Sequence, residues 1–162
     1  MAEDKKKKKL SMVVFSGDLD KLMGAFIIAV SAAASNMEVT MFFTFWGFRA
    51  LKKEDVKTGK SFMGKIMGLF ESGGIDKANP SKYSMGGIGR KMFKKMMASK
   101  NVASLSDLRQ MAIDMGAKLY PCQMSKDVLE IPDEALIDEA EKTVGAGFFV
   151  EQAANSDFTL FI

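Results

Sequence analysis

Apolar residues gather in short blocks along this 162-residue chain, and turn-forming residues separate the blocks. Residues 10–15 are an apolar run closed by the polar residues 16–18, which predicts a buried first strand ending in a turn. Residues 22–34 are rich in alanine and predict a helix that packs closely on a sheet, with an aspartate of the preceding turn as its N-cap. Residues 38–45 predict a second buried strand. Together these elements form a right-handed βαβ unit, which indicates an α/β fold.

Hydrophobic periodicity returns in the last third of the chain. Apolar residues between positions 105 and 115 recur at helical spacing, and Gly116 stands where a left-handed C-cap is expected. The later segments predict a strand over 117–122, a short helix over 126–131 with Ser125 as its N-cap, helices over 133–142 and 147–154, and an apolar strand over 157–162. We therefore expect a mostly parallel open sheet of about four to five strands with helices on both faces, as in flavodoxin-like folds.

Residues 49–100 differ from the rest of the chain because they are rich in lysine, methionine and glycine. Apolar residues at positions 62, 66 and 69, and again at 88, 92 and 96, fall on single helical faces and predict two short amphipathic helices. The residues between them are typical of a loop. We interpret this Met/Lys-rich segment as a helical insertion that covers the core. Its adaptable apolar surface could instead form a subunit or partner interface.

The composition fits one domain of ordinary size, with 48% hydrophobic and 27% charged residues. The formal net charge is +3, but five of the 23 basic residues form the lysine run at positions 5–9. We expect residues 1–9 to be a disordered basic tail ahead of a single domain over 10–162. Contact of the tail with nucleic acid or anionic lipid is the lesser alternative, so no nucleic-acid partner is predicted.

Residues 22–48 contain a single charge, at Glu38, and resemble a membrane span in hydropathy. Ser35 and Asn36 divide this stretch into a helical half and a strand-like half, and neither reaches the roughly 20 residues that a spanning helix needs. The first residues also lack the pattern of a secretory signal peptide. We expect a protein of the reducing cytoplasm, with membrane contact as a minor alternative.

The chain has one cysteine, Cys122, and no histidine, and these two counts exclude most familiar active sites. Without histidine there is no Ser-His or Cys-His pair and no imidazole metal ligand. With one cysteine, an intrachain disulfide, a redox pair of cysteines and a cysteine-rich metal site are all impossible. No dinucleotide-binding glycine motif follows the first strand. We predict neither a cofactor nor a metal, and Cys122 is the candidate catalytic residue.

The position of Cys122 favours a reactive thiolate. It ends a predicted strand just ahead of a helix, where the helix dipole and the positive charge of Lys126 would stabilise the thiolate. If the first strand is central, with the second and third strands on either side, Cys122 lies opposite Gly17 and Asp18, with Trp46 nearby in an apolar wall. The candidate residues lining the site are Gly17, Asp18, Trp46, Ser125 and Lys126. A role for Cys122 as a small buried hydrophobe remains the alternative.

Five segments resemble, in order, the longer branch of the DsrE/DsrF-like sulfur-relay family: SGDLDK, EVTMFFTFWG, SKYSMGGIGRKMFKKMM, SLSDLRQMAIDMGAKLYPCQMSKDV and SDFTLFI. They cover essentially the whole chain after the lysine run, and FFTFWG and the CQMS neighbourhood are the most specific. The resemblance implies an α/β sheet fold, oligomers, and a cysteine that carries sulfane sulfur as a persulfide or thiosulfonate. Cys122 would be the sulfur acceptor, while Gly17, Asp18 and Trp46 match the pattern without an assigned role. Some members have a second cysteine, so the single cysteine here makes an intramolecular handover impossible.

By this resemblance the chain would be a sulfur carrier or sulfurtransferase-like protein that accepts sulfur on Cys122 and passes it to a partner thiol. The implied partners are TusA-like or rhodanese-like proteins and further copies of the chain, and whether turnover is enzymatic stays open. One alternative is a non-catalytic oligomeric interaction module that docks through residues 49–100. Another is a single-cysteine redox protein, which the lack of an arginine beside Cys122 disfavours.

Overall fold

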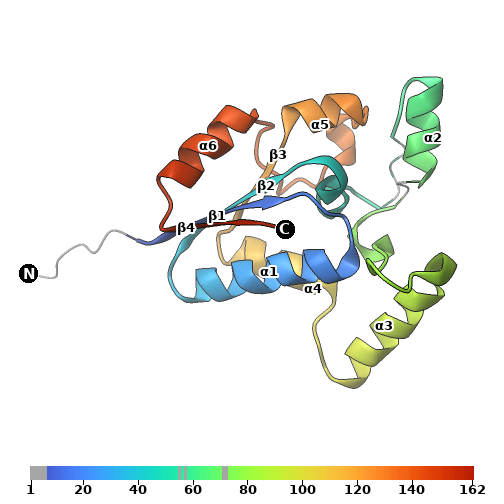
Figure 1. Ribbon diagram of the computed structural model, residues 1–162, viewed down its shortest axis with the longest axis horizontal. Coiled ribbons are helices and arrows are strands. Elements are labelled where there is room, and N and C mark those ends of the chain that lie inside the picture. Colours follow the sequence, from blue (N-terminus) through green and yellow to red (C-terminus); the bar gives the residue numbers. More distant parts are fainter. Residues whose placement is uncertain (1–6, 55, 57, 71–72) are drawn as a thin grey trace, which may run out of the picture.

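The protein is built on a four-stranded sheet in which all strands run parallel, in the order β3-β2-β1-β4 (Figure 1). The computed structural model describes residues 7–54, 56, 58–70 and 73–162. The strands are β1 (Lys9–Val14), β2 (Glu38–Phe43), β3 (Lys118–Pro121) and β4 (Phe158–Phe161). Their carboxyl ends are in register, since Val14 lies opposite Phe43 and Phe43 lies opposite Pro121. The predicted parallel α/β sheet is confirmed.

Helices cover both faces of the sheet, as the apolar strands require. Helices α1 (Leu19–Ala34) and α4 (Leu105–Asp114) pack on one face, and α6 (Ala146–Ala154) packs on the other (Figure 1). On the α6 side, the ring of Phe149 stacks on Phe42 with centroids 5.4 Å apart. On the α1 side, Phe26 stacks on Phe43 with centroids 6.1 Å apart. The core therefore lies on both faces of β2.

Helix α1 packs closely because small side chains alternate with large ones on its inner face. Its buried residues recur at intervals of three and four and are Leu19, Leu22, Met23, Ala25, Phe26, Ala29 and Ala32. The alanines bring the helix axis near the sheet, and the larger residues fill the space between them. The end of helix α4 is equally well specified, since Gly116, which follows the C-cap residue Met115, has a φ of +89°, the left-handed conformation predicted there.

The Met/Lys-rich insertion is helical, and it lies at the end of the molecule toward which the strands point (Figure 1). It begins within the 3-10 helix η1 (Phe45–Leu51). It contains the 3-10 helices η2 (Ile75–Lys77) and η3 (Met85–Gly87), and the α-helices α2 (Phe62–Phe70) and α3 (Ile88–Ser99). Polar contacts attach it to the body. The backbone N–H and the hydroxyl of Ser81 both donate to the Asp20 carboxylate at 2.7 Å. Although partial burial alone would raise the pKa of Asp20, these hydrogen bonds lower it.

The structure corrects the expected strand order. β3 pairs with β2, and the second neighbour of β1 is the C-terminal strand β4. The expectation that the third strand lies beside the first, with Cys122 opposite Gly17 and Asp18, is therefore wrong. Strand order depends on long-range packing that hydrophobic periodicity does not encode.

Two predicted local features are also wrong. Ser125 does not cap a helix over 126–131, because helix α5 (Gln123–Val128) begins earlier and has Cys122 as its N-cap. The predicted helix over 133–142 is only the 3-10 helix η4 (Asp133–Ala135). Beyond it the chain runs beside β3, where the N–H groups of Glu141 and Val144 donate to Leu119 and Pro121 carbonyls at 2.9 Å. These bonds satisfy an otherwise open sheet edge, which a helix could not do.

The N-terminal strand begins one residue before its predicted start. Lys9 already pairs with β2 and forms an ion pair with Glu38 at 3.0 Å. The lysine run up to residue 6 belongs to the predicted tail and lies outside the described residues. In the part of the chain that the structure describes, no helix has both the length and the apolar character needed to cross a membrane.

Candidate functional site

Cys122 lies at the junction of β3 and α5, and its backbone is fixed on both sides. Its N–H donates to the Phe43 carbonyl of β2 at 2.9 Å, and its carbonyl accepts from Lys126 N–H at 3.0 Å, which closes the first turn of α5. On the other side it forms a parallel bridge with Val144. The sulfur is thus attached to the carboxyl end of the sheet, where open α/β folds place their ligand sites.

The thiol of Cys122 is free but buried, with 3% of the residue exposed. It occupies the N-cap position of α5, although in this structure its side chain forms no capping hydrogen bond. A thiolate at an N-cap is stabilised by the N–H groups of the first turn. The position is therefore compatible with nucleophilic chemistry, while the burial means that a large reagent must displace neighbouring groups to reach the sulfur.

Ser125 lies one turn further along α5 and binds the end of β2. Its hydroxyl lies 2.7 Å from that of Thr44, and both residues are buried. A buried hydroxyl needs such a partner because leaving it unpaired is costly. The pair holds the first turn of α5, and with it Cys122, against the segment that follows β2.

Lys126 is engaged in an ion pair. Its ammonium contacts the Asp133 carboxylate of η4, and its side chain is mostly buried while that of Asp133 is exposed. The positive charge expected to favour the Cys122 thiolate is thereby partly balanced by a carboxylate. Lys126 also contributes to fixing the loop after α5 against η4.

Gly17 and Trp46 lie together at the ends of β1 and β2. A Cβ placed on Gly17 would come within 2.5 Å of the Trp46 carbonyl oxygen, so only glycine permits this approach. The indole of Trp46 is 40% exposed on η1. Gly47 makes a similarly close backbone approach to β1. Its N–H donates to the Phe15 carbonyl at 2.9 Å, and a Cβ on Gly47 would overlap the Val14 carbonyl oxygen.

The carboxylate of Asp18 contacts residues close to it in the sequence. Its carboxylate accepts from the Ser16 hydroxyl at 2.9 Å and forms an ion pair with Lys21 at 3.2 Å. Asp18 is also the N-cap residue of α1 by position. These contacts stabilise the turn that begins α1. Asp18 therefore has a structural role at the edge of the site.

The strand order divides the candidate residues into two groups. Cys122 and Ser125 stand at the ends of β3 and β2, whereas Gly17 and Asp18 stand at the end of β1. The segment that follows β2 joins the groups, because Thr44 contacts Ser125 and Trp46 contacts Gly17.

Between them, Phe45 has a φ of +44°, an unusual backbone conformation for a phenylalanine. Its ring packs on Phe15 with centroids 5.1 Å apart, which helps to hold this conformation.

Sequence reasoning missed Thr44 and Val144. Thr44 had a signal, since it is a polar residue set between an apolar strand and the FWG segment. Val144 had none, because its contact with Cys122 depends on the extended course of residues 141–144. Both residues fix the position of the thiol through hydrogen bonds or strand pairing.

A small pocket, with room for about one water molecule, lies beside η1, between that helix and the loop after α5. Arg49 and Lys52 contribute to its lining, together with apolar side chains. Both cations are buried and already interact with other groups. Cys122 is not among the lining residues, so this pocket gives no direct access to the sulfur.

The described part of the chain holds no cluster of three or more aspartate, glutamate or cysteine side chains that could bind a metal ion.

This architecture matches a known family. A profile of the DsrE/DsrF/DrsH-like family matches residues 6–161, nearly the whole chain. The chain belongs to the DsrE/DsrF/DrsH-like family. Among its members, the chain is 41% identical over 156 residues to a Bacillus subtilis (strain 168) protein named "Uncharacterized protein YrkE", with 96% of this chain and 97% of that protein covered.

A second relative carries a functional name. The chain is 37% identical over 163 residues to "Sulfur carrier protein DsrE2" of Allochromatium vinosum, covering 96% of this chain and 98% of the relative. Among solved structures, the ychN protein from E. coli superposes with a TM-score of 0.59 at 11% identity, covering 96% of this chain and 99% of that chain. At that identity the likeness establishes the shared DsrE-like fold.

Proposed function

We propose that the protein is a sulfur carrier that accepts sulfane sulfur on Cys122 and passes it to a partner thiol. The observation that carries the proposal is that the only sulfhydryl of the chain stands at the carboxyl edge of the sheet, at the start of a helix, in a member of this family. The relative named a sulfur carrier matches along nearly its whole length, which supports the same role here.

The chemistry needs no histidine. The Cys122 thiolate attacks the outer sulfur of a donor persulfide, the donor's S–S bond breaks, and its electron pair leaves on the donor's inner sulfur as a thiolate. Cys122 then holds the outer sulfur as a persulfide. An acceptor thiolate attacks that sulfur in turn, and Cys122 is returned as a thiolate. Each step exchanges one S–S bond for another, so no external oxidant is consumed.

Burial sets the order of events. Because only 3% of Cys122 is exposed, a protein donor reaches the sulfur only when neighbouring groups move, and we expect the first turn of α5, which Cys122 itself begins, to take part in that movement. The Thr44 to Ser125 hydrogen bond opposes that movement. Burial also protects the resting thiol from oxidation. The compartment that we propose for this protein is the reducing cytoplasm.

The partners we propose are thiol proteins of the TusA-like or rhodanese-like kind, which would supply or receive the sulfur. Transfer can be tested by loading the protein with sulfur, removing excess donor, and adding a TusA-like acceptor. Loss of sulfur from Cys122 together with its appearance on the acceptor, measured by intact mass, supports the proposal. Sulfur that stays on Cys122 in the presence of the acceptor counts against a carrier role, and Cys122→Ser is the control that should deliver none.

We further infer that the chain forms homo-oligomers through β4 and α6. β4 is an edge strand, and Phe161 on it is 72% exposed, with Phe158 and Val150 of α6 also exposed. An apolar edge strand left open invites pairing with another chain. A second copy would cover both the strand edge and the neighbouring apolar side chains.

A further inference from the structure

Helix α3 presents a row of apolar side chains to solvent. Ile88, Met92 and Met96 recur every four residues and are 64%, 56% and 58% exposed. Lys91 and Lys95 form the next row and are exposed as well. From its sequence this segment is expected to cover the core, but in the structure these three side chains point outward. The outer face of α3, defined by these five residues, thus combines an apolar ridge with two cations.

The opposite side of α3 faces the body. Gly89 and Met97 are buried there, and a Cβ on Gly89 would overlap the Tyr83 carbonyl, so the start of the helix lies tightly against the preceding loop. Phe93 is partly buried against the core on the same side. The outward orientation of the apolar ridge is consequently fixed by packing.

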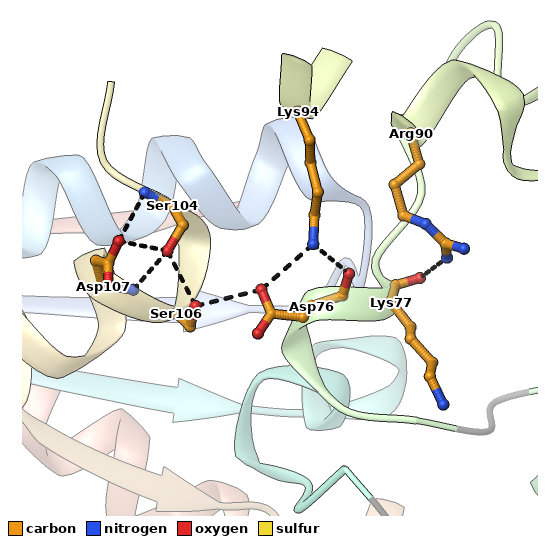
Figure 2. Close-up of polar contacts among 7 residues, drawn as sticks. All are labelled: Asp76, Lys77, Arg90, Lys94, Ser104, Ser106 and Asp107. Carbon is orange, nitrogen blue, oxygen red and sulfur yellow. Dashed lines mark hydrogen bonds and ion pairs between the residues drawn. The ribbon is translucent and has the colours of Figure 1, made fainter. Parts of the chain in front are cut away.

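Polar contacts hold the helix in this orientation (Figure 2). The Lys94 ammonium donates to the Asp76 carbonyl at 2.7 Å and contacts the Asp76 carboxylate at 3.4 Å. The Arg90 guanidinium donates to the Lys77 carbonyl at 2.7 Å. Asp76 also accepts from Ser106 of α4 at 3.2 Å, which connects α3 to the body. The two inward cations are therefore used for attachment, and Lys91 and Lys95 are left on the outer face.

The segment of the chain that contains this helix carries charge of one sign. Residues 77–106 contain no aspartate or glutamate, and their basic residues are Lys77, Lys82, Arg90, Lys91, Lys94, Lys95 and Lys100. Within the described part of the chain, α3 forms one ion pair, between Lys94 and Asp76. A positive surface of this kind attracts a negatively charged partner.

We propose that the outer face of α3 binds the surface of an anionic lipid bilayer. Ile88, Met92 and Met96 enter the boundary between headgroups and acyl chains, and Lys91 and Lys95 pair with anionic headgroups. A bilayer suits this face better than a folded protein does, because the exposed side chains stand on a helix that projects from the body (Figure 1). Flexible methionine side chains need no complementary pocket when they enter an acyl layer.

The test is co-sedimentation of the full-length protein with vesicles. One set contains phosphatidylcholine alone, and the other contains equal parts of phosphatidylcholine and phosphatidylglycerol. We expect binding to the second set, weakened by added salt because headgroup attraction is screened. The double variant Lys91→Gln/Lys95→Gln should bind roughly thirtyfold more weakly, since each lysine near an anionic surface contributes about 1 kcal/mol. Met92→Gln with Met96→Gln should weaken it at least about tenfold.

Matched variants on the body serve as controls. Met111 and Met115 are exposed methionines on and after α4 at the same spacing, and Lys118 and Lys142 are exposed lysines. Their double glutamine variants should bind vesicles as the wild type does. Circular dichroism verifies that each variant is folded, and a variant that fails this check is replaced by the corresponding single substitution.

Three results would overturn the proposal. The wild type could fail to bind the anionic vesicles, or the α3 variants could bind them as well as the wild type does. The third is binding of the wild type to poly-L-glutamate in the absence of vesicle binding, which would assign the face to an acidic protein.

Discussion

The hydroxyl oxygens of Thr44 and Ser125 lie 2.7 Å apart in the interior, and they connect the end of β2 to the first turn of the helix that Cys122 begins. Removing either hydroxyl, in Thr44→Val or Ser125→Ala, leaves the other buried and unpaired. We expect each variant to lose about 1–3 kcal/mol of unfolding free energy. The double variant should lose less than the sum, because it has no orphaned hydroxyl. Urea denaturation of the four proteins measures this coupling, and additive losses would contradict it.

The same pair should control access to Cys122. Because the thiol is buried in the native protein, a bulky thiol reagent should react with it at least about tenfold more slowly than with the urea-unfolded chain. Ser125→Ala should loosen the first turn of α5 and so speed the reaction of the native thiol, which brings its rate closer to that of the unfolded chain. The reaction is followed by absorbance or by mass. Native Cys122 that reacts as fast as the unfolded thiol would contradict the description of a covered sulfur.

Glu130 should act as a clamp on α2. Its carboxylate accepts from the N–H groups of Lys60 and Ser61 just before that helix, and the hydrogen bonds from Ser61 and Lys60 lower the pKa of Glu130 from its ordinary value of 4.5. A lowered pKa means that the clamp contributes fully above pH 4.5 and is lost as the pH falls through the lower folded value.

The clamp is tested with Glu130→Gln at neutral pH, which should speed amide hydrogen exchange in residues 60–66, since a neutral amide accepts these bonds more weakly. In the wild type, the Ser61 amide resonance should titrate below pH 4.5. Glu134→Gln, an exposed neighbour, is the control and should leave exchange unchanged. Equal exchange in the wild type and Glu130→Gln would refute the clamp.

Core packing on α1 gives a stability prediction with a matched control on the same helix. Phe26 is fully buried and stacks on Phe43, so Phe26→Ala should cost about 3–5 kcal/mol. Ile27 is exposed on the next position, and Ile27→Ala should cost less than about 1 kcal/mol. Thermal or urea unfolding compares the two. Similar costs for both would mean that α1 does not pack as described.

The homo-oligomer can be tested at the β4 edge. A charge at Phe161, in Phe161→Asp, should dissociate the assembly, because an unpaired carboxylate in an apolar interface is costly. Phe62→Asp places the same charge at an exposed phenylalanine of α2 and should leave the assembly intact. Light scattering coupled to size-exclusion chromatography gives the mass of each species. A monomeric wild type, or dissociation by Phe62→Asp alone, would contradict an interface at β4 and α6.

Sequence predicts the elements well where local chemistry decides them. The buried strands, the alanine-rich helix α1, and the left-handed Gly116 that follows the C-cap of α4 are explained by periodicity and backbone preference. The α2 and α3 helices of the insertion are also confirmed. Which side of α3 faces solvent could not be predicted, since both sides carry apolar residues.

Sequence predicts the site less well because the site depends on strand order. Cys122 was placed at a strand end ahead of a helix, and that position is confirmed, but its neighbours come from β2 and residues 141–144 rather than from β1. Ser125 looked like a helix cap because serine is a strong N-cap residue. Its hydroxyl instead binds Thr44, a contact between residues 81 positions apart that no local pattern encodes.

The central claim is that Cys122 accepts sulfur, and intact-mass spectrometry after incubation with a persulfidated donor tests it most directly. The wild type should gain sulfur, removable by a reducing agent and located on Cys122 by peptide mapping. Cys122→Ser should gain none under the same conditions. A wild-type protein that stays at its unmodified mass, with a folded circular dichroism spectrum and an active donor, would contradict the account.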